Sequence, residues 1–167
     1  DFGVDEVVER LAQIEPKVLF VCDAYRAGGA RVDIAGKVAE IAERLPSLVC
    51  MVLVPSEPGS QSKSPSTKTI RLADFRVAGA TLPRSMQQLP FDHPLFIVFS
   101  SGTTGKPKCI VHGAGGTLLQ HLKEHQLHSD VRQGDRVFYF TTCGWMMWNW
   151  LVSALASEAT IVLYEGS

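Results

Sequence analysis

Residues 4–22, VDEVVERLAQIEPKVLFVC, combine an amphipathic helix with the strand that follows it. Pro16 ends the helix, because proline cannot continue the helical hydrogen-bond pattern. The apolar run from Lys17 to Cys22 then has the length of a buried strand. The helix itself is indicated by apolar residues that recur at the spacing of one helix face, with charged residues between them: Val4, Val7, Val8, Leu11 and Ile14.

The same order of elements repeats downstream. Gly28 and Gly29 indicate a turn, and Asp33 is the predicted N-cap of a second helix that ends before Pro46. Residues 48–54 predict another buried strand. Such alternation is typical of an α/β fold with a mostly parallel sheet and helices on both faces.

The remainder of the chain is less regular. Residues 55–69 are rich in proline and serine and predict a surface loop, whereas residues 70–90 follow no clear pattern. Order resumes at Pro94. From there the pattern predicts strands at 95–99, 136–140 and 160–164, and helices at about 117–128 and 145–156.

Composition narrows the function classes. A chain of 167 residues is expected to form one domain or a large part of one. The net charge of −1 gives no long-range field for nucleic acid or an anionic membrane, so neither is an expected partner. None of the four cysteines forms the C-x-x-C pair of a metal or redox site. Three of them lie beside apolar runs, where cysteine behaves as a small hydrophobic residue, which favours a reducing compartment and a cytoplasmic protein.

One uncharged stretch approaches the length of a membrane span. It runs over the 20 residues 138–157. Gly144 interrupts its middle, and Thr141, Asn149 and Ser153 are polar. The stretch therefore predicts a buried strand followed by a buried helix, and no membrane span is expected.

The segment SSGTTGKPK, Ser100–Lys108, carries the chemistry. Hydroxyl groups and two glycines follow a predicted buried strand, and glycine permits the backbone to approach a phosphate closely. Amides and hydroxyls then donate hydrogen bonds to phosphate oxygens, and two lysines add positive charge. The candidate phosphate-binding residues are Ser100, Ser101, Gly102, Thr103, Thr104, Gly105, Lys106 and Lys108.

Other phosphate-binding motifs do not fit. The Walker A pattern requires a glycine where Ser100 stands and a serine or threonine where Pro107 stands. The dinucleotide pattern fails because Leu118 occupies the position of the third glycine after Gly113. An ordinary hydrophilic turn between two strands is the remaining alternative.

The segment resembles the phosphate-binding motif of the adenylate-forming superfamily. Residues 93–128 and 134–167 are similar to the short-chain acyl-CoA synthetases, and residues 1–20 together with GWMMWNW at 144–150 resemble the group that activates acetoacetate. Two positions depart from the family pattern. Cys109 and Glu158 stand where relatives have small residues.

The resemblance implies an acid–thiol ligase that uses ATP, Mg²⁺ and CoA. In this family a carboxylate attacks the α-phosphate of ATP, and CoA then displaces AMP from the acyl-adenylate. Trp145, Met146 and Met147 match the segment that lines the acyl pocket. The substrate alternatives are acetate and propionate, and the alternative of another class is a non-catalytic nucleotide-binding module.

The resemblance also implies that residues 1–167 are part of the large N-terminal domain of such an enzyme. The magnesium-binding, ribose-binding and catalytic lysine motifs of the family have no match in this chain. No catalytic residue is therefore expected within it, and the remainder of its own polypeptide is an expected partner, alongside the small-molecule substrates.

A histidine-rich helix offers a competing site. His121 and His125 lie four positions apart beside Glu124, a spacing that would place both imidazoles on one helix face. The H-E-x-x-H pattern is absent, and no cysteine is nearby. A polar helix face is the favoured interpretation, and no metal site is expected.

Overall fold

The computed structural model describes residues 2–57, 66–76, 85–100 and 105–164. It divides into two compact units: unit 1 comprises residues 1–84 with 102–107 and 166–167, and unit 2 comprises residues 85–101 and 108–165. The two units are described separately.

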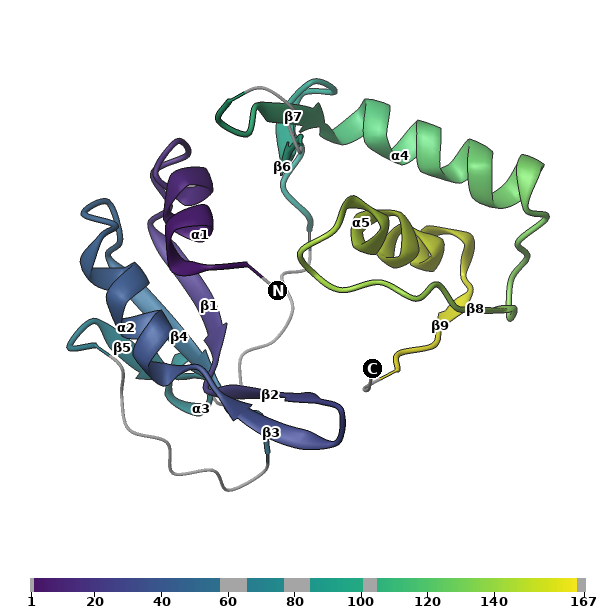
Figure 1. Cartoon of the computed structure of the whole chain (residues 1–167). Coiled ribbons are helices and arrows are strands. Elements are labelled where there is room, and N and C mark those ends of the chain that lie inside the picture. The colour runs from purple at the N-terminus through teal and green to yellow at the C-terminus, as the bar shows by residue number, and fades with distance from the viewer. Residues whose placement is uncertain (1, 58–65, 77–84, 101–104, 165–167) are drawn as a thin grey trace. The chain divides into compact units, whose positions relative to one another are not determined.

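Unit 1 contains a parallel three-stranded sheet in the order β1–β4–β5 (Figure 1). The strands are β1 (Val18–Cys22), β4 (Cys50–Val54) and β5 (Thr69–Arg71). Leu19 pairs with Met51 and Phe20 with Val52, so successive residues alternate between the two faces. The central strand is the best buried, since Met51 and Val52 are both fully inaccessible to solvent.

Helices cover both faces of this sheet, as predicted. On one face α1 (Val4–Leu11) and α2 (Ala35–Glu43) enclose the core of unit 1, to which Leu19 and Val21 of β1 contribute. On the other face Phe75 of α3 (Leu72–Phe75) meets Phe20 edge-on, with ring centroids 5.7 Å apart. The α/β class and the parallel sheet are therefore confirmed.

A hairpin missed by the sequence pattern follows β1. It pairs β2 (Ala24–Ala27) with β3 (Ala30–Asp33) in antiparallel register. Gly28 and Gly29 form the predicted turn with φ of 55° and 79°, values that favour glycine. The N-cap prediction is wrong by one residue. Ile34 occupies that position, while the Asp33 Oδ1 accepts a hydrogen bond from the Ala35 amide at 2.9 Å.

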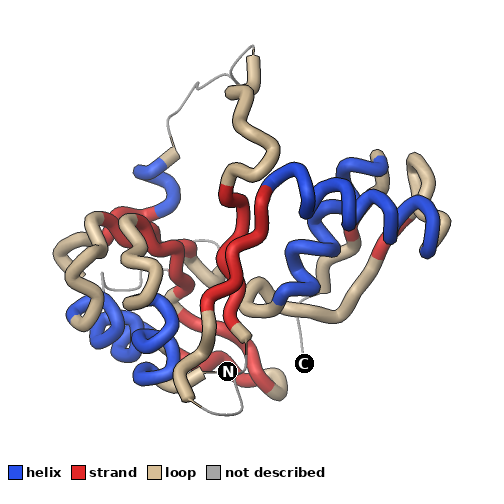
Figure 2. The backbone as a smooth tube through the Cα atoms, turned by 90° about the horizontal axis from the view of Figure 1, so that it is seen from above, coloured by secondary structure: helices blue, strands red, loops and turns tan. Residues whose placement is uncertain are grey.

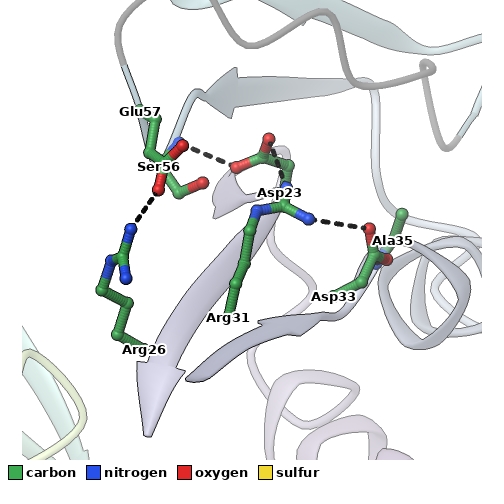
Figure 3. Close-up of polar contacts among 7 residues, drawn as sticks. All are labelled: Asp23, Arg26, Arg31, Asp33, Ala35, Ser56 and Glu57. Carbon is green, nitrogen blue, oxygen red and sulfur yellow. Dashed lines mark hydrogen bonds and ion pairs between the residues drawn. The ribbon is translucent and has the colours of Figure 1, made fainter. Parts of the chain in front are cut away.

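The Asp23 side chain links the β2–β3 hairpin to the parallel sheet through polar contacts (Figure 3). Its side chain is only 1% exposed. One carboxylate oxygen accepts a hydrogen bond from the Ser56 amide at 2.7 Å, just beyond β4, and the other lies 3.3 Å from the Arg31 guanidinium on β3. An exposed ion pair between Arg26 and Glu57 joins the same two segments at 2.6 Å.

Unit 2 begins with an antiparallel hairpin that continues into a helix. β6 (Pro94–Phe99) pairs with β7 (Cys109–Gly113), and the two strands lie side by side in the middle of Figure 2. α4 (Ala114–Leu122) begins at the end of β7 and runs into η1 (Lys123–His128), a turn of π-helix. A side chain at Gly115 would place its Cβ 2.2 Å from the Phe91 ring, which explains one glycine of the GAGG run.

The rest of unit 2 consists of α5 (Met146–Ser153), the 3₁₀ turn η2 (Ala154–Ser157) and two short parallel strands, β8 (Arg136–Val137) and β9 (Thr160–Ile161). The predicted strands at 136–140 and 160–164 are thus too long. Phe140 and Leu163 lie beyond the paired residues and are exposed. Glu158 adopts φ of 56° in the turn before β9, which explains why small residues suit that position.

Two histidine side chains of the histidine-rich helix are buried, although much of the helix surface is exposed. His121 and His125 are 7% and 0% exposed, so the interpretation of a solvated polar face is wrong for both. Burial is the main cause that lowers the pKa of each imidazole, and both rings are therefore neutral at pH 7. Neither ring nitrogen of His125 has a hydrogen bond of favourable geometry, and the ring packs 4.3 Å from that of Trp150.

None of the four cysteines forms a disulfide in the described part of the chain. No helix among the described residues is long and apolar enough to cross a membrane. The uncharged stretch instead supplies the whole of α5 and η2, and the strand predicted at its start is not formed, since β8 ends at Val137.

The Asp23 network makes a prediction about stability. Asp23→Ala removes the carboxylate that accepts from the Ser56 amide and pairs with Arg31. A hydrogen bond to a charged group contributes about 1.5–3 kcal/mol, so we expect the free energy of unfolding to fall by an amount of that size. Asp23→Asn keeps an oxygen for the Ser56 amide and is expected to lose less. Glu57→Ala is the control, since an exposed ion pair contributes about 0–1 kcal/mol. Denaturant unfolding that ranks Glu57→Ala with Asp23→Ala would contradict this account.

The buried histidines make a prediction about pH. Burial lowers the pKa of both histidines in the folded state, whereas in the unfolded chain each keeps the ordinary value of about 6.5. As the pH falls through that value, the unfolded chain therefore takes up protons before the folded one. Stability is therefore complete above that pH and is lost below it, by at most about 1.4 kcal/mol per pH unit for each histidine. We expect His125→Phe to flatten the decline in melting temperature between pH 7 and 5. An equal flattening by His128→Phe, at the exposed end of η1, would show that burial is not the cause.

Candidate functional site

The candidate phosphate-binding segment, Ser100–Lys108, called the phosphate-binding segment below, connects the two strands of the β6–β7 hairpin. Phe99 and Cys109 are paired in register on either side of it. Two hydrogen bonds close its base: the Ser100 amide donates to the Lys108 carbonyl at 3.0 Å, and the Lys108 amide lies 3.4 Å from the Ser100 Oγ. Ser101, Gly102, Thr103 and Thr104 lie outside the described residues.

The second half of the segment combines a glycine conformation with exposed positive charge. Gly105 has φ of 119°, a backbone conformation that strains any other residue. Lys106 and Lys108 are exposed, while Pro107 between them is buried. Within unit 1, the Pro107 carbonyl accepts a hydrogen bond from the Gln13 side chain at 3.1 Å. Both ammonium groups are therefore open to an anionic ligand.

The connection around the segment differs from that of a Walker A loop. A Walker A loop leads from a strand into a helix, whose N-terminus faces the phosphates. Here the segment leads into β7, which runs antiparallel to β6. Any phosphate would therefore be held by the amides, hydroxyls and lysines of a hairpin loop rather than by a helix dipole.

The candidate acyl segment forms the start of α5. Trp145 is the N-cap residue with an extended backbone, and Met146 and Met147 occupy the first turn. Trp145 is 58% and Met146 45% exposed, whereas Met147 is half-buried. The structure thus brings three apolar side chains together at one helix end, where they are accessible to a small ligand.

The sequence pattern did not assign two other residues of α5, Trp150 and Ser153, to this region. Trp150 donates its indole N–H to the Glu124 carboxylate at 2.8 Å, and Ser153 meets the His121 Nδ1 at 2.8 Å. The spacing of the histidines was visible in the sequence, but nothing there indicated their partners on α5. Among the described residues, no group of three His, Cys, Asp or Glu side chains could hold a metal ion.

Comparison with known proteins agrees with this geometry. The family model for AMP-binding enzymes matches residues 1–167. The acetoacetyl-coenzyme A synthetase of Rhizobium meliloti (strain 1021) is 53% identical over 168 residues, which cover 100% of this chain and 26% of the relative. The malonamoyl-CoA synthetase vrtB of Penicillium aethiopicum is 49% identical over 173 residues, covering 100% of this chain and 24% of that protein.

A solved structure is similar over the same range. The acetoacetyl-CoA synthetase from Streptomyces lividans has a TM-score of 0.90 and 45% identity, covering 100% of this chain and 25% of its own. The chain therefore spans about a quarter of the length of the relatives it matches. With a family model matched from end to end, the chain belongs to the family of AMP-binding enzymes.

Proposed function

We propose that this chain forms part of an acid–thiol ligase that activates acetoacetate with ATP and transfers the acyl group to CoA. The supporting observation is the phosphate-binding segment, closed at its base between β6 and β7 in a chain of the AMP-binding family. The 53% identity to an acetoacetyl-coenzyme A synthetase supports the choice of acid.

In the proposed reaction a carboxylate oxygen attacks the α-phosphorus of ATP. The bond from that phosphorus to the bridging oxygen breaks, and pyrophosphate leaves with the electron pair. The thiolate of CoA then attacks the acyl carbon and displaces AMP. The chain's own contribution is to hold the polyphosphate and lower the cost of its growing charge, through Ser100, Lys106 and Lys108 among the described residues.

The names of the relatives suggest what the acid pocket recognises. Acetoacetyl and malonamoyl groups share a carbonyl at the third carbon and differ there in a methyl or an amino group of similar size. We propose that Trp145, Met146 and Met147 contact this end of the acid, since they form an accessible apolar cluster at the start of α5. Acetate and propionate lack that carbonyl and are the alternative substrates.

ATP in such a reaction is expected to carry Mg²⁺. The described residues near the phosphate-binding segment are hydroxyl and ammonium groups, and no cluster of three His, Cys, Asp or Glu side chains is present in the described part of the chain. Mg²⁺ prefers carboxylate and phosphate oxygens. These residues alone therefore do not form a magnesium site, and the metal would depend on the phosphates and on the remainder of the polypeptide.

We also propose that the protein works in the reducing cytoplasm, in agreement with four cysteines that form no disulfide among the described residues. The proposed partners are the small-molecule substrates and the remainder of its own polypeptide.

Acid-dependent exchange between ATP and pyrophosphate in the full-length protein tests this function. The acids to compare are acetoacetate, malonamate, acetate, propionate and 3-hydroxybutyrate. We expect the fastest exchange with acetoacetate. Lys108→Ala should reduce it about ten- to a hundredfold, the range that corresponds to one charge-assisted hydrogen bond to phosphate. Lys37→Ala on the exposed side of α2 is the control for loss of a positive charge.

The outcomes separate the alternatives. Exchange led by acetate or propionate would retain the ligase class and replace the substrate. No exchange with any acid, in a protein that still binds ATP, would favour the non-catalytic nucleotide-binding module.

Residues 1–167 alone are expected not to form an acyl-adenylate, because they span about a quarter of the relatives and hold no catalytic residue of the proposed reaction. The measurement is formation of radioactive acyl-AMP from labelled ATP and acetoacetate, with the full-length protein as positive control. Product from the 167-residue chain above the level without acid would refute this expectation.

A further inference from the structure

Side chains of α4 and η1 hold α5 at successive positions. The Glu124 carboxylate accepts the indole N–H of Trp150 at 2.8 Å. The His125 ring packs against the same indole, with centroids 4.3 Å apart. One turn earlier on α4, the His121 Nδ1 meets the Ser153 Oγ at 2.8 Å. Trp150 is thus bound both at its polar edge and on its ring.

The hydrogen bonds around Ser153 define the tautomer of His121. The Ser153 hydroxyl donates to the Asn149 carbonyl at 2.9 Å, so its oxygen accepts from the histidine. The network therefore assigns the proton of the neutral His121 ring to Nδ1. The bond requires a proton on Nδ1, and the ring is otherwise neutral because burial lowers the pKa of His121.

Both oxygens of the Glu124 carboxylate are engaged. Oε1 accepts from the Gln120 side chain at 2.5 Å, and Oε2 accepts from Trp150. The Gln120 hydrogen bond is the largest cause that lowers the pKa of Glu124, and the Trp150 hydrogen bond acts in the same direction. Glu124 is thus a carboxylate at neutral pH, held in one orientation by its own helix, and its bond to α5 is charge-assisted.

The bound tryptophan lies on the same helix face as the candidate acyl residues. Met146 and Met147 precede Trp150 by four and three positions, the spacing at which helical side chains are neighbours. A rotation of α5 about its axis would therefore move the indole and both methionines together. Fixing the indole against Glu124 fixes the direction in which the methionines point.

We infer that Glu124 is a positioning residue for acid specificity: by holding Trp150, it sets the orientation of Met146 and Met147 toward the acid. This inference rests on the proposed function, because it assigns the methionines to the acid pocket. It concerns binding of the acid alone, since neither Glu124 nor Trp150 belongs to the phosphate-binding segment.

The test is steady-state ATP–pyrophosphate exchange with three variants of the full-length protein. Trp150→Phe keeps an aromatic ring against His125, removes the N–H donor and reduces the ring in size. Glu124→Ala removes the acceptor, and Glu124→Gln retains an oxygen that accepts. We expect Trp150→Phe and Glu124→Ala each to raise the KM for acetoacetate about five- to twentyfold, less than the full effect of one charge-assisted hydrogen bond, because the lost bond acts on the acid only through the methionines. The KM for ATP should stay within twofold, and Glu124→Gln should restore much of the acid KM.

A double variant and a matched control separate positioning from general destabilisation. Because both changes break one bond, the Glu124→Ala, Trp150→Phe double variant should match the worse single variant rather than multiply the two effects. Gln126→Ala removes another hydrogen bond between these helices, to Ser157 at 3.1 Å, beyond the end of α5. It should leave the acid KM unchanged even where it lowers the melting temperature.

Each outcome decides the inference. An acid KM unchanged in both Trp150→Phe and Glu124→Ala, or raised equally by Gln126→Ala, overturns it while the proposed function stands. Parallel increases in the KM for ATP would also overturn it. Should Glu124→Ala fail to fold, Trp150→Phe and Glu124→Gln still give the comparison. Absence of exchange in the unmodified protein with every acid overturns the proposed function, and this inference with it.

Discussion

The antiparallel register between β6 and β7 is the constraint on which the candidate site depends. At one end of the ladder Phe99 lies opposite Cys109, which brings Ser100 and Lys108 close enough to close the phosphate-binding segment. At the other end Pro94 lies opposite Gly113, from which α4 begins. A shift of the register by one residue would turn every side chain of one strand to the opposite face of the hairpin. It would also break the pairing at both ends of the ladder. One ladder therefore positions both the segment and the helix that carries Glu124.

Buried polar groups occur where separate elements are joined. Asp23 links the β2–β3 hairpin to the end of β4, and His121 links α4 to α5. Apolar contacts permit small rotations and shifts at little cost, whereas a buried polar group without its partner costs free energy. Such groups favour one arrangement of their elements over neighbouring ones. Asp23 is satisfied by two donors, while His125 avoids the cost of buried charge by staying neutral.

Local patterns predicted the elements that bury one regular face. The sequence predicted the apolar face of α1 and the apolar strand β1 because each hydrophobic pattern is contained within a few consecutive residues. Pairing was not predictable in the same way. Whether β7 runs antiparallel to β6, or how far β8 and β9 pair, depends on residues distant in sequence. The partners of His121 and Glu124 lie on α5 some thirty and twenty-six positions onward, beyond any local signal. A phosphate-binding role for Ser100–Lys108 could be proposed from the sequence because the candidate residues lie within nine consecutive positions.

Under the proposed function, acid selection by two methionines requires that their helix be held in one position. Methionine is unbranched and adapts its shape, so a pocket lined by it excludes few ligands by shape alone. A methylene group in an apolar pocket changes binding by only about 10- to 200-fold. Selection for the acid that carries a carbonyl at its third carbon therefore depends also on where the flexible side chains start. The backbone of α5 sets where these side chains start. Trp150 holds that backbone through its hydrogen bond to the Glu124 carboxylate, whose other oxygen accepts a hydrogen bond from Gln120. A rigid support behind adaptable side chains is the arrangement that lets a small apolar cluster discriminate between acids of similar size.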